Sequence, residues 1–238
     1  MFSLFKNTEK RTDVHIWDGL SILPNDVKNV VVKGGIFKIK SFAFANCHKL
    51  TNIIISEDVA IIGTKAFENC INLKNIIFSD NIIKISSGAF INCKSLTSIR
   101  LPPGLESIGP NSFFGCESLE EIILPSTLLY LGLGAFARCD SLCDIKFWGS
   151  SQINTIPRLI FSKCKGLISI NIPYGICIID SEAFSGCIHL MNIKIPQSIN
   201  IIKKDAFYNC KKLSEVIVYK NTIIEKGAFC KTTKIVRI

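Results

Sequence analysis

The chain has 238 residues, of which 48% are hydrophobic and 20% are charged, and its formal net charge is +9. This composition excludes an intrinsically disordered chain, and no apolar run approaches the roughly 18 residues that a membrane-spanning helix requires. The positive charge permits nucleic acid or an anionic membrane as a partner, but it does not by itself indicate either.

The N-terminal segment becomes polar directly after Phe5. A secretory signal requires an apolar stretch of about 7 to 15 residues, which this segment lacks, so we expect the protein to be cytoplasmic. Residues 1–27 place Trp17, Leu20 and Ile22 among polar neighbours. This pattern predicts an N-terminal cap over the end of a core that residues 28–238 build as a single domain.

From residue 28 onward the chain is a repeat. Phenylalanine recurs at intervals of 22 to 25 residues, mostly after alanine, at Phe44, Phe67, Phe90, Phe113, Phe136, Phe161, Phe184, Phe207 and Phe229. Cysteine stands three residues after the first eight of these, at Cys47, Cys70, Cys93, Cys116, Cys139, Cys164, Cys187 and Cys210, and leucine stands three residues further on. A fixed period of this length is typical of a solenoid.

Each repeat predicts two kinds of element. After the leucine come two apolar residues two positions apart, such as Ile99 and Leu101, which indicate a β-strand. Proline often follows, as at Pro102, and ends strand pairing. From Ala-Phe to the leucine the apolar residues lie three apart, which favours a short helical or 3₁₀ turn. We therefore expect a stack of about eight 23-residue coils, each with a strand and such a turn.

The repeat A-F-x-x-C-x-x-L-x-x-I-x-[IL]-P-x-x-[IL]-x-x-I resembles the BspA-like leucine-rich repeats, and residues 89–108 match it best. The resemblance covers about residues 28–238. It implies a right-handed leucine-rich-repeat solenoid. For the family as a whole it also implies protein binding and adhesion at cell surfaces, without catalysis.

The cysteine column admits three interpretations. Stacked coils would place equivalent cysteines about 4.8 Å apart, which permits disulfides. Structural zinc ligands are usually paired two to four residues apart, whereas these cysteines recur once per coil and no histidine column accompanies them. We favour free thiols that act as small apolar core residues. Cys143, Cys177 and Cys230 lie outside the column, and we expect them at the surface.

No motif indicates catalysis. The sequence lacks GxSxG, HExxH, a Walker loop and GxGxxG. The densest acidic pair, Glu120 and Glu121, fits a solvated strand face. The sequence therefore predicts a protein that is not an enzyme and has no catalytic residue, cofactor or bound metal.

Strand alternation predicts which residues a partner could contact. The residue between each inward pair faces outward, and Trp148 lies at the only two-residue insertion in the repeat. Tryptophan is enriched at interface hot spots, although local packing would also explain it, and apolar outward residues could reflect β-propensity alone. The predicted contact residues are Ile54, Ile77, Arg100, Ile123, Lys146, Trp148, Asn171 and Lys194.

We predict a non-enzymatic scaffold that binds a protein partner through its sheet face. One alternative, from the family resemblance, is a cell-surface adhesin or antigen that binds host or matrix protein. Another is an electrostatic binder of nucleic acid or anionic membrane, because residues 203–238 contain nine Lys or Arg and three acidic residues. We favour a different role for Lys231, Lys234 and Arg237, which is to protect an exposed sheet edge from association.

Overall fold

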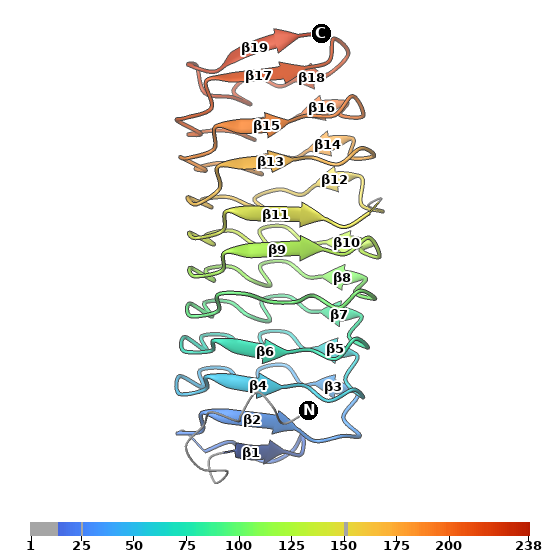
Figure 1. Cartoon of the computed structure of the whole chain (residues 1–238), viewed down its shortest axis with the longest axis vertical. Helices are drawn as coiled ribbons and strands as arrows, with labels where there is room; N and C mark the ends of the chain where they lie inside the picture. The colour runs from blue at the N-terminus through green and yellow to red at the C-terminus, as the bar shows by residue number, and fades with distance from the viewer. Residues whose placement is uncertain (1–13, 25, 150–151) are drawn as a thin grey trace.

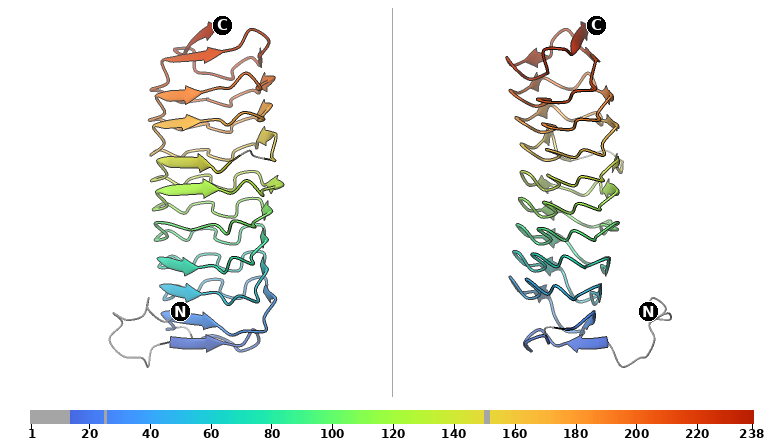
Figure 2. Two further views of the ribbon diagram at one scale, coloured as in Figure 1. Left: turned by 45° about the vertical axis from the view of Figure 1, so that its right-hand side comes forward. Right: turned by 90° about the vertical axis from the view of Figure 1, so that its left-hand side faces the viewer.

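The computed structural model describes residues 14–24, 26–149 and 152–238. In these ranges the chain forms a right-handed parallel β-solenoid, in which successive coils stack along one axis (Figure 1). The two further views show an elongated stack with β1 (Val14–Trp17) and β19 (Lys234–Arg237) at opposite ends of the axis (Figure 2). The predicted solenoid is therefore confirmed.

Most coils contribute to two ladders of parallel strands. The long-strand ladder consists of β1 (Val14–Trp17), β2 (Asn29–Val32), β4 (Asn52–Ile54), β6 (Asn75–Ile77), β9 (Glu121–Leu124), β11 (Asp144–Phe147), β13 (Ser169–Asn171), β15 (Asn192–Lys194), β17 (Glu215–Val218) and β19 (Lys234–Arg237). The short-strand ladder consists of β3 (Lys38–Ile39), β5 (Ile61–Ile62), β7 (Lys84–Ile85), β8 (Ser107–Ile108), β10 (Tyr130–Leu131), β12 (Thr155–Ile156), β14 (Ile178–Ile179), β16 (Ile201–Ile202) and β18 (Ile223–Ile224).

The register of the long-strand ladder follows the sequence period. Asn29 pairs with Asn52 and Asn52 with Asn75, so equivalent positions lie side by side. The amide side chains form a row of their own, in which Asn52 Nδ2 donates to Asn29 Oδ1 at 2.6 Å and Asn75 Nδ2 donates to Asn52 Oδ1 at 2.7 Å. The row adds side-chain hydrogen bonds between the first coils.

The phenylalanine column forms the centre of the core. Phe44, Phe67, Phe90 and the five column phenylalanines that follow, up to Phe207, are fully buried. Each ring stacks on the next with centroid distances from 4.8 to 5.9 Å, and the largest distance lies across the two-residue insertion, between Phe136 and Phe161. Trp17 of β1 covers the first ring with its centroid 4.8 Å from that of Phe44. The segment predicted as a cap thus supplies both a strand and this covering side chain.

The predicted short helical or 3₁₀ turn is wrong, because the described residues contain no helix of either kind. Left-handed residues stand two positions before and two positions after each column phenylalanine from Phe44 to Phe207; around Phe44 they are Phe42 and Asn46, both with φ of 62°. A helix requires consecutive right-handed residues, so one left-handed residue ends it. The spacing of apolar residues three apart reflects a chain of tight turns instead.

The cysteine column lies in the core, as predicted. All eleven cysteines are described and are free thiols, and Cys70 to Cys210 of the column are buried. The thiol of Cys70 donates to the carbonyl oxygen of Phe44 in the preceding coil at 3.0 Å, and six further column cysteines repeat this contact. Burial raises the pKa of the Cys116 thiol to about 12, so it stays protonated at neutral pH. Outside the column, Cys143 is exposed, whereas Cys177 and Cys230 are half-buried.

The long-strand ladder is interrupted at the coil after β6. Pairing runs from β1 to β6 and resumes at β9, and Figure 1 shows no strand in the coil between them. Within the described chain, no backbone amide or carbonyl of Ser98, Ile99, Arg100 or Leu101 makes a hydrogen bond with β6 or β9. Two consecutive prolines, Pro102 and Pro103, follow this segment and supply no amide donors.

Replacement of a stacked phenylalanine should destabilise the protein strongly. Phe113→Ala removes a fully buried ring and should lower the free energy of unfolding by about 3–5 kcal/mol, since it loses apolar contacts and leaves a cavity. The neighbouring Phe114 is only half-buried, so Phe114→Ala should cost no more than about 1 kcal/mol. Urea denaturation followed by circular dichroism measures both, and equal losses would contradict the central role of the column.

The buried thiols should make stability depend on alkaline pH. The folded-state pKa of Cys116 lies above its ordinary value of 9.0, so the stabilisation is complete below about pH 9 and is lost as the pH rises from there towards the folded pKa. In that pH window, each such thiol should make the free energy of unfolding fall by up to about 1.4 kcal/mol for each unit by which the pH rises. Urea titrations under reducing conditions at pH 8 to 10 measure the slope. Cys116→Ala should reduce this slope, whereas Cys143→Ala, which removes an exposed thiol, should not. An unchanged slope in Cys116→Ala would contradict the raised pKa of this thiol.

The interruption of the ladder should be visible in hydrogen exchange. Without hydrogen-bond partners in the described chain, the amides of Ile99, Arg100 and Leu101 should exchange at least ~100-fold faster than those of β4, which pairs on both sides. Exchange resolved by NMR at neutral pH tests this. Protection of the Ile99 and Arg100 amides equal to that of Ile53 would mean that the ladder is continuous.

Candidate protein interface

The outward positions of the long-strand ladder differ in accessibility from one end of the stack to the other. Ile54 lies on the outer side of β4 but is only 7% exposed, and Ile77 of β6 is half-buried. Arg100, Ile123 and Lys146 in the following coils are exposed. The predicted contact residues therefore do not form one continuous apolar stripe, and Ile54 offers a partner little surface.

Four predicted contact residues line one groove on the strand face. Arg100, Ile123, Lys146 and Trp148 surround a hollow of about 620 Å³ that crosses three successive coils. The remaining lining residues are Ser98, Ile99, Leu101, Pro103, Glu121, Pro125 and Phe147. Its lining includes Ser98 to Leu101, the residues of the coil that forms no long strand.

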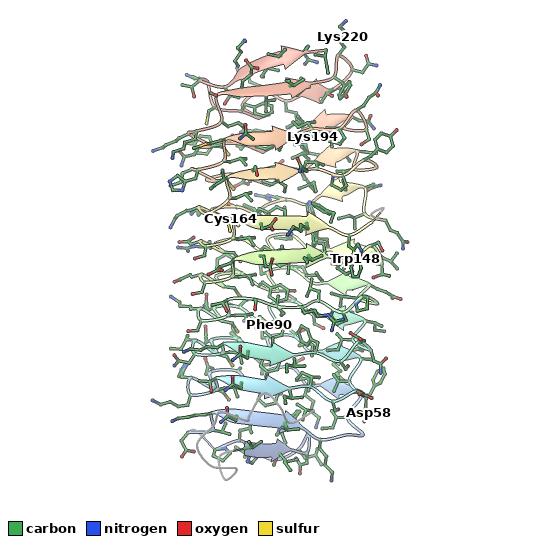
Figure 3. The ribbon with its side chains drawn as sticks, viewed as in Figure 1. Asp58, Phe90, Trp148, Cys164, Lys194 and Lys220 are labelled. Carbon is green, nitrogen blue, oxygen red and sulfur yellow. The ribbon has the colours of Figure 1, made fainter. Side chains whose placement is uncertain are left out.

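Trp148 forms one wall of the groove. It follows β11 directly, and its backbone amide donates to the carbonyl of Leu124 at 2.8 Å, which fixes the main chain against β9. The side chain is 64% exposed, and Figure 3 places it beside the C-terminal ends of β9 and β11. The indole is thus held at its base and presents most of its surface to solvent. Ser150 and Ser151 of the predicted insertion lie outside the described residues.

The charges around the groove form weak pairs. Arg100 lies 3.6 Å from Asp80, and both side chains are mostly exposed. Lys146 Nζ lies 2.6 Å from Asp144 Oδ2, and this hydrogen bond raises the pKa of Lys146 above its usual value. Exposed pairs of this kind contribute little to stability. Arg100 and Lys146 can therefore leave these carboxylates and pair with a carboxylate of a partner.

The last two predicted contact residues line a second groove. Asn171 of β13 and Lys194 of β15 face a hollow of about 500 Å³ that also includes Ile217 and Tyr219, and Figure 3 shows Lys194 on β15. The long-strand ladder is again interrupted here, between β15 and β17. Both grooves thus coincide with places where strand pairing stops.

Other exposed apolar groups carry no signal in the repeat pattern. Leu129 and Tyr130, next to the short-strand ladder, are 60% and 50% exposed, and Ile223 of β18 is also exposed. Pro103, Pro125 and Phe147, which also line the first groove, were not predicted as contact residues. In the repeat pattern proline indicates the end of a strand, and Phe147 occupies an inward position, so neither residue type indicates a groove.

The basic C-terminal residues are engaged in contacts within the chain. Arg237 donates to the carbonyl oxygens of Lys220 at 2.9 Å and Thr222 at 3.1 Å. Lys234 forms an ion pair with Glu215 at 2.8 Å. These two side chains tie β19 to the preceding coil.

The described residues hold no group of three or more His, Cys, Asp or Glu side chains that could bind a metal ion. Across the same residues, no helix long and apolar enough to cross a membrane occurs.

Comparison with solved structures places the fold among leucine-rich repeat proteins. A leucine-rich repeat protein from Bacteroides ovatus is 30% identical with a TM-score of 0.75, and the match covers 85% of this chain and 55% of that one. This chain therefore spans little more than half the length of that protein. The leucine-rich repeat protein of T. pallidum is 26% identical with a TM-score of 0.59, and the match covers 84% of this chain and 83% of that one.

No curated protein is similar to this chain in sequence. The family described as BspA type leucine rich repeat region, in six copies, matches residues 37–157 and 149–238. These matches include nearly every coil that carries the Ala-Phe, cysteine and leucine columns, so the chain belongs to the BspA-type leucine-rich repeat family.

Proposed function

We propose that this leucine-rich repeat protein is a non-enzymatic scaffold that binds a protein partner through the first groove, the one lined by Arg100, Ile123, Lys146 and Trp148. The observation that carries the proposal is the convergence of an exposed tryptophan, an exposed isoleucine and two basic side chains on one hollow. Repeat proteins of this family generally take part in protein interactions, and that supports the same reading.

The composition of the groove suits a protein interface. Aromatic and arginine side chains contribute most of the binding energy at interfaces, usually at the centre of a contact and surrounded by polar groups. Here Trp148, Ile123 and the two prolines provide the apolar centre, and Arg100, Lys146 and Glu121 provide the polar rim.

The stack behind the groove keeps it in place. Ile122 and Leu124 point inward from β9 and are 1% exposed, so Ile123 between them is held on the outer face. A partner would therefore bind a preformed surface and lose little affinity to ordering of the protein backbone.

Quantitative affinity capture from native cells tests the proposal. Partners recovered with the wild type should fall at least ~10-fold with the double variant Ile123→Asp, Trp148→Ala, because the variant removes the apolar centre and introduces a charge. Tyr174→Ala is the matched control: this aromatic residue is 77% exposed and lies outside both grooves.

The control variant should recover the partners at wild-type level. Circular dichroism and the urea midpoint establish that each variant is folded. Equal recovery of the same proteins with the folded double variant would rule out the first groove as the binding site.

A further inference from the structure

One corner of the stack changes its charge halfway along the axis. The corner consists of the seven residues that follow each column phenylalanine and lead into the long strand, on the left-hand side of Figure 1. In the four coils from Phe44 to Phe113 these residues include three lysines and three glutamates, whereas in the four coils from Phe136 to Phe207 they include five lysines or arginines and one aspartate. The second half of the corner is therefore strongly basic.

The basic side chains of this second half are all exposed, and most of them have no carboxylate partner. We call this set the basic corner: Arg138, Lys163, Lys165, Lys211 and Lys212. Lys165 forms an ion pair with Asp140 at 2.6 Å. In the part of the chain that the structure describes, the other four form no ion pair. Glu182 and Asp205, which precede the phenylalanines of two of these coils, contact other cations.

The solenoid holds these cations in a row along the stack. Arg138 and Lys163 occupy the same position in successive coils, and their amides donate to the carbonyls of Ser162 and Ser185 in the next coil at 2.8 and 2.7 Å. The side chain of Lys163 extends along the row, since its Cγ lies 3.2 Å from the position that a Cβ on Gly186 would occupy. Stacked coils lie about 4.8 Å apart. The row therefore presents its charges at a fixed spacing, and little affinity is lost to ordering of the backbone.

Exposed apolar side chains lie beside the cations. Leu167 and Leu190 are fully buried, so the residues that follow them, Ile168 and Met191, face outward at the same corner. Their side chains are 51% and 43% exposed. The amide of Met191 donates to the carbonyl of Ile168 at 2.8 Å, so the two residues are neighbours in successive coils. The corner thus combines a row of cations with an exposed apolar pair.

This combination suits the surface of an anionic membrane. Clusters of about four to eight lysines or arginines are attracted to acidic lipid headgroups, and apolar side chains next to such cations enter the interface. Single-stranded nucleic acid is bound instead in basic grooves lined by aromatic side chains on which the bases stack. The basic half of the corner is an outer edge of the stack, and its sequence contains one aromatic residue, Tyr208.

We propose that the basic corner binds the surface of an anionic membrane, with its cations at the lipid headgroups and with Ile168 and Met191 in the interface. The row of cations runs along the long axis of the stack (Figure 2), so the solenoid would lie with this axis parallel to the membrane. The proposal does not rest on the first groove, whose lining contains no residue of the corner.

Flotation with lipid vesicles tests the proposal. The full-length protein should bind phosphatidylcholine vesicles that contain about 30 mol% phosphatidylserine at least ~10-fold more tightly than vesicles of phosphatidylcholine alone. An increase in salt concentration should weaken this binding, because salt screens exposed charges. Equal binding to both kinds of vesicle, or binding to neither, overturns the proposal.

A charge reversal locates the contact on the protein. Lys211→Glu, Lys212→Glu should weaken binding to the phosphatidylserine vesicles at least ~10-fold. The matched control is Lys38→Glu, Lys84→Glu, which changes the net charge equally at exposed positions of the short-strand ladder and should retain most of the affinity. Circular dichroism establishes that both variants are folded. Equal losses in the two variants would attribute the binding to net charge and reject the corner as its site.

Removal of the apolar pair distinguishes a membrane from other polyanions. Ile168→Ser, Met191→Ser keeps every cation and should weaken binding to the phosphatidylserine vesicles at least ~5-fold, and unchanged binding would exclude these side chains from the interface. A single-stranded oligonucleotide is the competing probe. If it binds more tightly than the vesicles and depends in the same way on Lys211 and Lys212, the corner is a nucleic-acid site and the membrane proposal is wrong.

Discussion

The backbone hydrogen bonds of the Ala-Phe turn hold the stack together. The amide of Phe44 donates to the carbonyl of Ala66 in the next coil at 2.7 Å, and the bond recurs at each phenylalanine of the column up to Phe207. It persists across the two-residue insertion, where Phe136 donates to Ile160 at 3.0 Å, although the short-strand ladder stops there between β10 and β12. In the described residues, this row of turn hydrogen bonds is continuous from the coil of Phe44 to the coil of Phe229, whereas the long-strand and short-strand ladders are both interrupted.

The left-handed residues of the turn make this row possible. Phe42, Phe44 and Asn46 donate forward to the next coil, while the intervening Ala43 and Ala45 donate to carbonyls three residues back. Right-handed residues throughout would direct all amides along the turn itself, as in a helix. A left-handed non-glycine residue costs about 1–2 kcal/mol, and in each coil the bonds to the next coil and the buried phenylalanine offset that cost.

The sequence predicts the stack well because one period governs the inward positions. Phe90, Cys93 and Leu96 must each match the same residue 23 positions away, since a change in volume would disturb both neighbouring coils. The turn conformation was not predictable from this pattern: apolar residues three apart fit a helix and a run of tight turns equally, and left-handed φ at Lys65 or Arg138 has no strong signature in residue type.

The candidate interface was predictable only in part. Alternation placed Arg100, Ile123 and Lys146 on the outer face, and the insertion singled out Trp148, and all four line the first groove. Alternation gives the direction of a side chain but not what covers it, so the burial of Ile54 could not be anticipated. Nor could the break at Ser98 to Leu101, since their pattern of residues matches that of coils whose strands do pair.

The break leaves the core nearly intact because the coil opens on one side only. At the turn, Phe90 donates to Ser112 at 2.7 Å and the rings of Phe90 and Phe113 stay 5.2 Å apart. On the strand side, Ile99 and Leu101 are 7% and 8% exposed, whereas Ile122 and Leu124 in the paired strand β9 are each 1% exposed. Because the turn hydrogen bonds keep the coils stacked, the loss of strand pairing in one coil exposes little apolar area. A groove can therefore form on the strand face while the solenoid stays continuous.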